Sequence, residues 1–355
     1  MTTRALVVAP CFHGADGVSA VSRQIVHALT RCRVTVSCLA LNEVEDHALV
    51  SDPLDLPVVS AAGHRASFAL HAMATSVAQR FDRIIVTHLQ LAPVAWLAHR
   101  LGKDVAVYLH GVEVWRTLRR RECALLESAR LLANSQHTVH RFKEWHPPFR
   151  ATPVTVCPPA APPRVTPTRP FDFASQTAVI VGRLSSEERY KGHDTLLDVW
   201  PSLLQRHPRA RLVVVGDGDD RARLEGRVHA ERLSASVECR GRIGRAELEQ
   251  VIDGCRVLVM PSSGEGFGIV YLEAMQAARP CIASPGAASE VIDDGTTGLL
   301  VPVNDRVALL EALHALYADG PRAAAMGAAG AVRARELFGL DRLSRNLAAA
   351  LDLSC

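Results

Sequence analysis

The chain contains very little lysine. Of its 40 lysine and arginine residues, only Lys103, Lys143 and Lys191 are lysines. Where such a chain retains a lysine, the compact, rotatable ammonium can serve a purpose that a planar guanidinium does not. We interpret Lys103 and Lys143 as chance retentions at exposed positions, which leaves Lys191 as the lysine of interest. The net charge of +3 is also small, so the composition does not indicate a nucleic-acid partner.

The cysteines form no motif, and long uninterrupted hydrophobic runs are missing. The nine cysteines are scattered and no Cys-x-x-Cys spacing occurs, which argues against a disulfide framework or a zinc site and predicts buried free thiols in a reducing cytoplasm. The longest apolar region, residues 84–98, is interrupted by His88, Gln90 and Pro93 and falls short of a membrane span. The residues before the apolar run 5–10 are too few for a secretory signal. The expected location is therefore the cytoplasm.

Short apolar runs alternate with helical patterns, which predicts an α/β fold built from parallel sheets with crossover helices. The predicted strands are residues 5–10, 34–41, 57–61, 83–88, 105–110 and 131–135 in the first half, and 178–184, 211–216, 237–241, 257–261, 280–284 and 298–301 in the second. Between them the proline-rich segment 146–170 predicts a stiff connector. A length of 355 residues with 48% apolar and 22% charged residues suits two globular domains. Doubly wound domains bind ligands at the carboxyl ends of their strands, so we expect a crevice there.

The most informative segment is residues 264–275, Gly-Glu-Gly-Phe-Gly-Ile-Val-Tyr-Leu-Glu-Ala-Met. Its three glycines let the backbone approach a ligand closely. The apolar run 269–275 predicts a buried helix whose first free N–H groups bind an anion, phosphate above all. Glu265 on the turn and Glu273 in the helix would accept hydrogen bonds from hydroxyl groups on either side of that phosphate, which predicts a nucleotide sugar as the ligand. The plainer alternative is a tight turn before an ordinary core helix, with Glu273 facing solvent.

This segment resembles glycosyltransferase family 4, whose members carry two glutamates separated by seven residues in an E-G-F-G-x-x-x-x-E-A-M context. The resemblance implies a GT-B fold with two Rossmann-like domains. It also implies transfer of a hexose-type sugar from a UDP- or GDP-sugar to a hydroxyl group of a saccharide or lipid-linked acceptor, with retention of anomeric configuration. It implies an acceptor-binding domain at residues 1–165, a donor-binding domain at 166–337, and a terminal helix at about 338–355 that packs back on the first domain. In the 264–275 segment it assigns donor binding to Glu265, Gly266, Phe267, Gly268, Ile269 and Glu273.

Two more segments of the second half carry the resemblance. Residues 182–192 place Arg183 at the end of a predicted strand and Lys191 at the start of a helix, similar to the family's G-R-x…K-G element, which implies that both hold the donor diphosphate. A surface loop with two solvated charges is the alternative. The segment 216–220, Gly-Asp-Gly-Asp-Asp, resembles the family's G-D-G turn. The alternative interpretation is an Asp-x-Asp metal site. We expect these carboxylates to cap a helix instead, because the positive side chains named above already supply the charge that a metal would bring. No metal or cofactor is expected.

In the first half, residues 10–18 resemble the family's Gly-Gly-Val loop, whose amides contact the donor diphosphate. Asp16 stands where the first glycine is usual, and a carboxylate near phosphate is unfavourable unless turned away, so only Gly17 is assigned. The loop lacks the G-x-G-x-x-G spacing of nicotinamide sites, and no Walker A sequence occurs.

His110 matches the family's H-G element, in which the histidine lies beside the donor sugar; a hydrogen-bonded structural histidine is the alternative. Ser135, in an Asn-Ser-x-x-Thr turn, is an expected N-cap.

The resemblance implies a mechanism without a nucleophile triad. The cations and amides named above would stabilise the leaving nucleotide diphosphate. Glu273 would hold the ribose hydroxyls, and the acceptor would attack from the face that the phosphate leaves. The expected catalytic residues are His110, Arg183, Lys191 and Glu265.

A basic, aromatic-flanked cluster follows His110 and consists of Trp115, Arg116, Arg119, Arg120 and Arg121. We expect it to meet the cytoplasmic membrane surface or a lipid-diphosphate acceptor, in polysaccharide, glycolipid or other glycoconjugate synthesis in bacteria. A solvated helix face is the alternative. Two other function classes remain open at this point: another GT-B enzyme, such as a nucleotide-sugar epimerase or phosphorylase, and a non-catalytic nucleotide-sugar binding protein. A binding protein could lose Glu265 or His110, so their presence argues for an enzyme.

Overall fold

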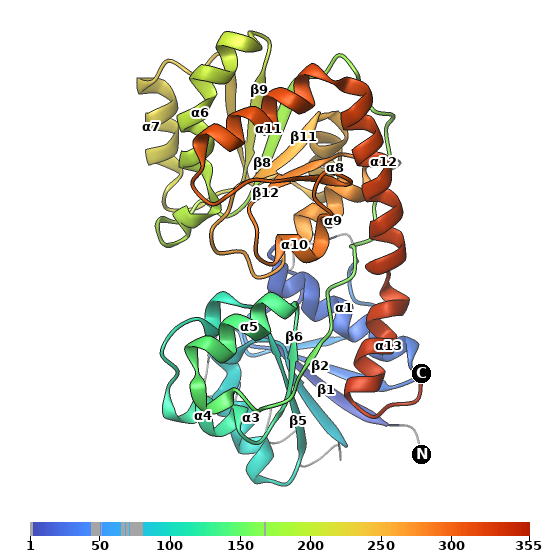
Figure 1. Ribbon diagram of the computed structural model, residues 1–355. Helices are drawn as coiled ribbons and strands as arrows, with labels where there is room; N and C mark the ends of the chain where they lie inside the picture. The colour runs from blue at the N-terminus through green and yellow to red at the C-terminus, as the bar shows by residue number, and fades with distance from the viewer. Residues whose placement is uncertain are drawn as a thin grey trace. The chain divides into compact units, whose positions relative to one another are not determined.

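The computed structural model describes residues 3–43, 50, 52–64, 68, 71, 81–166 and 168–355. The chain divides into two compact units, which are shown in Figure 1. Unit 1 consists of Met1–Pro162 and Phe338–Cys355, and unit 2 of Pro163–Leu337. The boundary expected from the sequence stood at 165/166. Both chain ends belong to unit 1, because the last helix returns to it.

Unit 1 is built on a parallel seven-stranded sheet in the order β3-β2-β1-β4-β5-β6-β7. Its strands are β1 (Arg4–Ala9), β2 (Thr35–Ala40), β3 (Val58–Ser60), β4 (Arg83–Val86), β5 (Asp104–Leu109), β6 (Arg130–Ala133) and β7 (Val154–Val156). After their first residues, Arg4, Arg83 and Asp104, the central strands β1, β4 and β5 are apolar, because helices cover both faces of the sheet. The strand order reverses between β1 and β4, which is where doubly wound sheets open a ligand crevice.

The helices of unit 1 lie on both faces of this sheet. They are α1 (Gly17–Arg31), α3 (Ala92–Arg100), α4 (Arg120–Leu126), α5 (Gln136–Trp145) and α13 (Leu340–Ala350), with the short 3₁₀ helices η2 (Leu89–Leu91), η3 (Val112–Val114) and η4 (Pro147–Phe149). Helix α13 packs beside α1, and α3 packs beside α4 on the other face. Leu6 and Val8 of β1 belong to the buried core under α3 and α4. As predicted, the Ser135 side chain caps α5 by accepting a hydrogen bond from the Thr138 amide.

Unit 2 has a parallel six-stranded sheet in the order β10-β9-β8-β11-β12-β13. Its strands are β8 (Thr177–Val181), β9 (Arg211–Val215), β10 (Val237–Gly241), β11 (Val257–Met260), β12 (Cys281–Ala283) and β13 (Gly298–Leu300). The run from Leu212 to Val215 in β9 is buried, as expected for a strand covered on both faces. Here the order reverses between β8 and β11, so the loops after these two strands flank the switch point.

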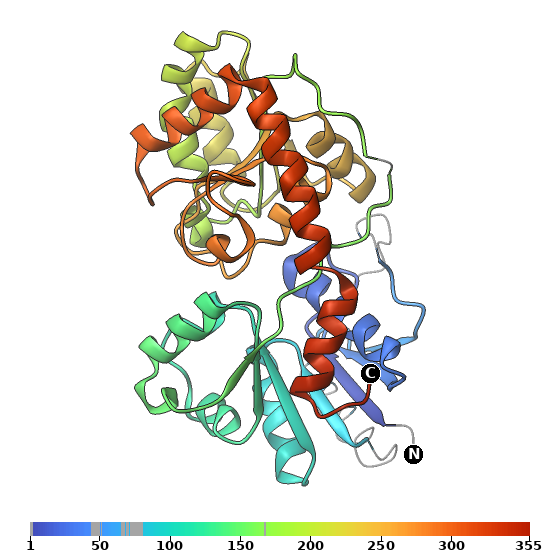
Figure 2. The same cartoon turned by 45° about the vertical axis from the view of Figure 1, so that its right-hand side comes forward.

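The helices of unit 2 again form two layers. They are η5 (Ser186–Lys191), α6 (His193–Arg206), α7 (Arg221–Ala230), α8 (Arg245–Gly254), α9 (Ile269–Gln276), α10 (Ala288–Val291), α11 (Arg306–Ala318) and α12 (Gly320–Leu337). Helix α11 packs beside α6, and α12 packs along α9, as Figure 2 shows. The Asp305 side chain caps α11 through the Ala308 amide, as predicted.

The predicted α/β class with doubly wound parallel sheets is confirmed, and each predicted strand corresponds to an observed one. Strand β7 was missed, because it lies inside the proline-rich segment that predicted only a connector. Pro153 and Pro158 flank the strand and do not interrupt its three residues. β7 is also the edge strand of its sheet, where neighbouring prolines are tolerated.

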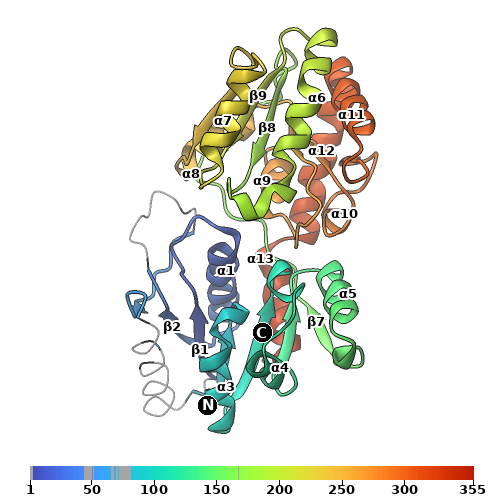
Figure 3. The ribbon, with the colours of Figure 1, turned by 90° about the vertical axis from the view of Figure 1, so that its left-hand side faces the viewer.

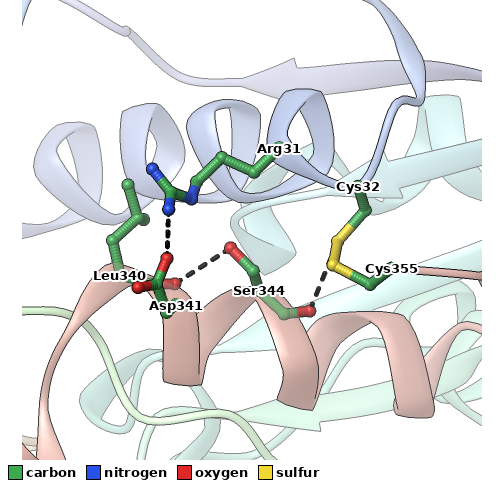
Figure 4. The surroundings of a disulfide bond; sticks show 6 residues. All are labelled: Arg31, Cys32, Leu340, Asp341, Ser344 and Cys355. Atoms are coloured by element: carbon green, nitrogen blue, oxygen red, sulfur yellow. Dashed lines mark hydrogen bonds and ion pairs between the residues drawn. A yellow bond between two sulfur atoms is a disulfide. The ribbon is translucent and has the colours of Figure 1, made fainter.

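The prediction that all cysteines are free thiols is wrong for one pair. Cys32, at the end of α1, and Cys355, the last residue, form a disulfide across 323 positions of sequence. Figure 4 shows the bond beside α13, where Arg31 also forms an ion pair with Asp341. The other seven cysteines form no disulfide. The spacing of the cysteines in the sequence did not predict this disulfide, because only the return of the C-terminal helix to α1 brings the two thiols together.

None of the helices described by the structure is long and apolar enough to cross a lipid bilayer.

Candidate active site

The predicted donor-binding residues of unit 2 come together where β8 and β11 lead into their helices. Arg183 and Lys191 lie in the segment between β8 and α6, and Glu265 lies between β11 and α9. Because β8 and β11 are adjacent and parallel, both loops leave the same edge of the sheet. Figure 3 shows α6 and α9 beginning at that end of unit 2. The topology therefore brings together motifs more than 70 residues apart at the switch point.

The turn before α9 requires glycine at its last position. Gly268 has φ of 88° and precedes the first helical residue. A Cβ atom there would lie 2.3 Å from the Tyr271 ring, a ring that is fully buried and donates its hydroxyl to the Met260 carbonyl. Phe267 is also buried. The glycine thus lets a closely packed turn deliver the free amides of α9 to the edge of the sheet, where an anion can bind them.

Lys191 and Glu265 face each other across the switch point. The Lys191 Nζ lies 3.5 Å from a Glu265 carboxylate oxygen, and the two side chains are only 15% and 20% exposed. The Tyr190 ring lies beside the ammonium, with its centroid 5.7 Å from Nζ. A partly buried cation beside a carboxylate can bind a phosphate oxygen and a sugar hydroxyl next to each other. This pair is the centre of the candidate site.

Glu188 joins this cluster, although no motif in the sequence singles it out. Its carboxylate forms an ion pair of 2.9 Å with Arg183 and lies 4.0 Å from the Lys191 ammonium. Arg183 is 65% exposed, so its guanidinium can turn towards a ligand. Two cations and two carboxylates therefore balance each other at this site.

Replacing Glu188 with glutamine should strengthen the binding of nucleoside diphosphates. An incoming diphosphate competes with this carboxylate for Arg183 and Lys191, and glutamine removes the competing charge. Because the pairs are partly exposed, we expect a gain of about twofold to fivefold in affinity, measured by calorimetry and shrinking at high salt. Glu187→Gln, the same change at the exposed neighbouring residue, is the control. Equal affinities for the Glu188 variant and wild type would contradict the idea.

The acidic turn after β9 fastens the η5 loop instead of capping α7. Asp219 accepts hydrogen bonds from the Ser186 amide and hydroxyl. Asp220 stands at the N-cap position but makes no side-chain cap bond; its carboxylate binds Arg189 and Arg223 instead. These hydrogen bonds lower the pKa of the Asp220 carboxyl. The predicted capping role is therefore wrong, because a nearby arginine pair outcompetes the helix amides.

Glu273 does not face solvent. Its carboxylate forms an ion pair with Arg245 at the start of α8, and the two side chains are 11% and 8% exposed. Arg245 also binds Glu249 at 3.0 Å. The plainer interpretation of the 264–275 segment, with a solvent-facing Glu273, is thus wrong in that respect. The sequence also gave no indication that an arginine holds this glutamate.

In unit 1, a carboxylate in the loop after β1 caps the helix that follows this loop. Asp16 is the N-cap of α1 and accepts hydrogen bonds from the Val18 and Ser19 amides, at 2.9 and 3.0 Å, and from the Ser19 hydroxyl. An anion at the start of α1 would compete with Asp16 for these amides. A diphosphate contact at Gly17 stays a prediction.

His110 lies in a polar cluster after β5. Its Nε2 is 2.6 Å from the Thr87 carbonyl, its amide donates to Glu113, and its carbonyl accepts from the Asn134 side chain. Burial lowers the pKa of His110 to about 4, so the ring is neutral at pH 7. A neutral ring that donates from Nε2 keeps a lone pair on Nδ1. His110 can therefore accept a hydrogen bond from a hydroxyl group through that atom.

The buried His110 ring should make the protein sensitive to acid. Below its ordinary pKa of about 6.5, the unfolded chain binds a proton that the folded protein refuses until about pH 4, so the free energy of unfolding falls as the pH drops through this window. At pH 5 the loss is about 2 kcal/mol. We expect urea unfolding of His110→Gln to change less between pH 7.5 and pH 5 than that of wild type. The exposed His229→Gln is the control, and an unchanged acid sensitivity in the His110 variant would contradict the assignment.

Part of the basic cluster after His110 forms contacts within unit 1. Arg116 forms an ion pair of 2.8 Å with the buried Glu122, which also accepts from the Arg119 amide at the start of α4. Trp115 packs under Arg141, whose guanidinium carbon lies 5.5 Å from the ring centroid. The side chains of Arg119, Arg120 and Arg121 are exposed. Part of the cluster thus stabilises the loop, and the remainder is a surface feature.

A family model for glycosyl transferases group 1 matches residues 175–319. Over 284 residues the chain is 34% identical to a GDP-mannose-dependent monoacylated alpha-(1-6)-phosphatidylinositol monomannoside mannosyltransferase from Corynebacterium glutamicum, a match covering 73% of this chain and 74% of that protein. The chain belongs to the glycosyl transferases group 1 family. It is therefore an enzyme, a glycosyltransferase of the hexosyltransferase class that uses a nucleotide sugar.

Other members and structures agree with this assignment. The glycosyltransferase is 36% identical to a GDP-mannose-dependent alpha-(1-6)-phosphatidylinositol monomannoside mannosyltransferase from Mycobacterium tuberculosis, over 48% of this chain and 46% of that protein. Among solved structures it is similar to sucrose-phosphate synthase from Thermosynechococcus elongatus, with a TM-score of 0.83 at 21% identity, covering 99% and 98% of the two chains. Anabaena Alr3699/HepE, in complex with UDP and glucose, has a TM-score of 0.80 at 19% identity, covering 99% and 100%. The GT-B fold expected from the resemblance is confirmed.

In this glycosyltransferase, two charged residues outside the sequence motifs neutralise the charges of residues within them. Glu188 pairs with Arg183, and Arg245 pairs with Glu273. Neither could be singled out, because a charged residue between motifs is usually solvated. The fixed spacing of 28 residues between Arg245 and Glu273 becomes meaningful only when α8 and α9 pack together.

Proposed function

We propose that this glycosyltransferase moves mannose from GDP-mannose to a hydroxyl group of a phosphatidylinositol-type glycolipid, with retention of anomeric configuration. Two relatives at 34% and 36% identity are GDP-mannose-dependent enzymes that act on phosphatidylinositol monomannoside, which supports this donor and this acceptor class. UDP-sugars are the alternative donors, and synthesis of another glycoconjugate or of a polysaccharide is the alternative setting.

The observation that carries the proposal is the Lys191–Glu265 pair at the switch point of unit 2. Lys191 and Arg183 would bind the diphosphate, with the amides from Gly266 to Ile269 completing its coordination. Glu265 would accept hydrogen bonds from hydroxyls of the donor sugar, and Glu273 from those of the ribose. In this arrangement the cations would lie where charge develops on the leaving group, and they would stabilise the transition state more than the ground state.

In the proposed reaction, the bond between the anomeric carbon and the diphosphate oxygen breaks as the acceptor oxygen forms its bond to the same face of that carbon. The departing GDP takes the electron pair of the broken bond, and its phosphate takes the proton of the acceptor hydroxyl. The neutral His110 ring would accept a hydrogen bond from the donor sugar. No step requires a metal ion, so activity is expected to persist in EDTA.

Unit 1 is proposed to bind the acceptor. The exposed guanidinium groups of Arg119, Arg120 and Arg121 suit the anionic headgroups at a cytoplasmic membrane face. Changing these three to glutamine should weaken sedimentation with phosphatidylinositol vesicles and raise the KM for the lipid acceptor. Unchanged vesicle binding and turnover would remove the membrane part of the proposal.

The test is an assay with radiolabelled GDP-mannose or UDP-glucose and phosphatidylinositol mannoside as acceptor. We expect labelled lipid with GDP-mannose only, and an α-linkage in the product by NMR. Product from UDP-glucose alone would overturn the donor. Binding of GDP-mannose with neither transfer nor slow hydrolysis would overturn the proposed reaction. Loss of hydrolysis in Glu265→Ala would link the activity to the proposed site.

A further inference from the structure

Glu273 is held by a row of charged side chains inside unit 2. Arg245 lies between Glu273 and Glu249, and forms an ion pair with each. The side chain of Glu249 is 1% exposed, that of Arg245 is 8% and that of Glu273 is 11%. Flexible side chains at a surface would not keep one geometry, but these three side chains are mostly buried.

Glu249 is itself fixed by the backbone where the chain enters unit 2. Its carboxylate accepts hydrogen bonds from the Val165 and Thr166 amides, at 3.0 and 2.8 Å, and from the Thr166 hydroxyl at 2.6 Å. Arg164 lies 3.9 Å from the same carboxylate. These bonds keep Glu249 charged in spite of its burial, and they lower the pKa of its carboxyl. Glu249 thus gives Arg245 a rigid anchor.

The position of Glu273 makes its orientation important. It lies four positions after Ile269, the first residue of α9, which places it about 6 Å further along the helix axis. A diphosphate at the start of α9 would bring the next part of the nucleotide, the ribose, to this depth. One carboxylate oxygen of Glu273 is already bound to Arg245. The other is then restricted to one direction and can accept a hydrogen bond from a ribose hydroxyl.

We propose that Arg245 is a positioning residue that, anchored by Glu249, orients the Glu273 carboxylate for recognition of the ribose hydroxyls. This inference rests on the proposed function, because it assumes that Glu273 meets a nucleotide. It adds that recognition depends on a residue of α8, which lies outside the motifs of the family resemblance. Without Arg245, Glu273 would swing freely and face the like charge of Glu249.

The experiment compares GDP with 2′,3′-dideoxy-GDP, and UDP with its dideoxy counterpart, by calorimetry. A hydrogen bond to a charged group corresponds to a preference of about 10- to 100-fold for the ribose form in wild type. We expect the preference to fall to within about threefold in Glu273→Gln and in Arg245→Met, and to recover partly in Arg245→Lys. In the transfer assay Arg245→Met should raise the donor KM about tenfold with little change in kcat, because ribose contacts are equal in the ground and transition states.

Two further variants keep the test decisive. Arg227→Met removes an arginine that also bridges carboxylates, Asp194 and Asp198 on α6, and should keep the full ribose preference. If Arg245→Met folds poorly, Arg245→Met combined with Glu249→Gln avoids the unpaired buried charge and should show the same loss of preference. Full ribose preference in the Arg245 variants, or equal loss in Arg227→Met, would overturn the inference and leave the proposed donor intact. A wild type that binds neither GDP nor UDP would overturn both.

Discussion

Replacing Lys191 with alanine is expected to lower the rate of sugar transfer by about 10²- to 10³-fold, the usual effect of removing one preorganised group that stabilises developing charge. The ammonium lies 3.5 Å from Glu265 and is mostly buried, so a water molecule cannot replace it at equal strength. The loss should appear mainly in kcat, because the charge on the diphosphate oxygen increases as the bond to the sugar breaks. Steady-state assays with the donor that the wild type uses will measure it.

The scarcity of lysine supplies the controls. Lys143→Ala removes a lysine from α5 of unit 1, and Lys103→Ala removes one whose Nζ donates to the Phe81 carbonyl; both should keep kcat within about twofold of wild type. Lys191→Arg retains the charge but replaces a compact ammonium with a planar fork, so it should recover only part of the activity. Full activity in Lys191→Ala would show that the diphosphate does not bind at this switch point.

Reducing the Cys32–Cys355 disulfide is expected to lower the free energy of unfolding of unit 1 by about 2–4 kcal/mol. The bond ties the last residue to the end of α1, so it restricts the unfolded chain across 323 residues. Urea unfolding with and without dithiothreitol measures the difference. In protein purified without reductant, Ellman's reagent should titrate seven thiols after denaturation and nine after reduction.

Cysteine variants distinguish this bond from general effects of the reductant. Cys355→Ser should match the reduced wild type and no longer respond to dithiothreitol. Cys11→Ser, which changes a partly exposed cysteine outside the disulfide, should keep the full response. If nine thiols titrate before reduction, the bond does not form in solution, and the ion pair between Arg31 and Asp341 with the packing of α13 on α1 would hold the C-terminus alone.

The loop that carries Lys191 illustrates how far a motif reaches. Its arginine and lysine were identified from the sequence, since both stand at fixed positions after a predicted strand. The structure adds that Asp219 and Asp220 fasten this loop and that Glu188 neutralises its cations. Such ion pairs depend on side-chain directions in three dimensions, and sequence spacing cannot give them.

The α/β class, every strand except β7 and the segments that flank each switch point could be predicted from the sequence, because apolar runs and glycine turns report local backbone requirements. The sequence also determined which residues carry the family motif. Which side chains pair with each other became known only from the three-dimensional structure. The members of three such pairs lie far apart in the sequence or stand outside any motif. These pairs are Arg245 with Glu273, Glu188 with Arg183 and Cys32 with Cys355. Their pairing follows from how helices pack on parallel sheets, and that packing is a property of the whole chain.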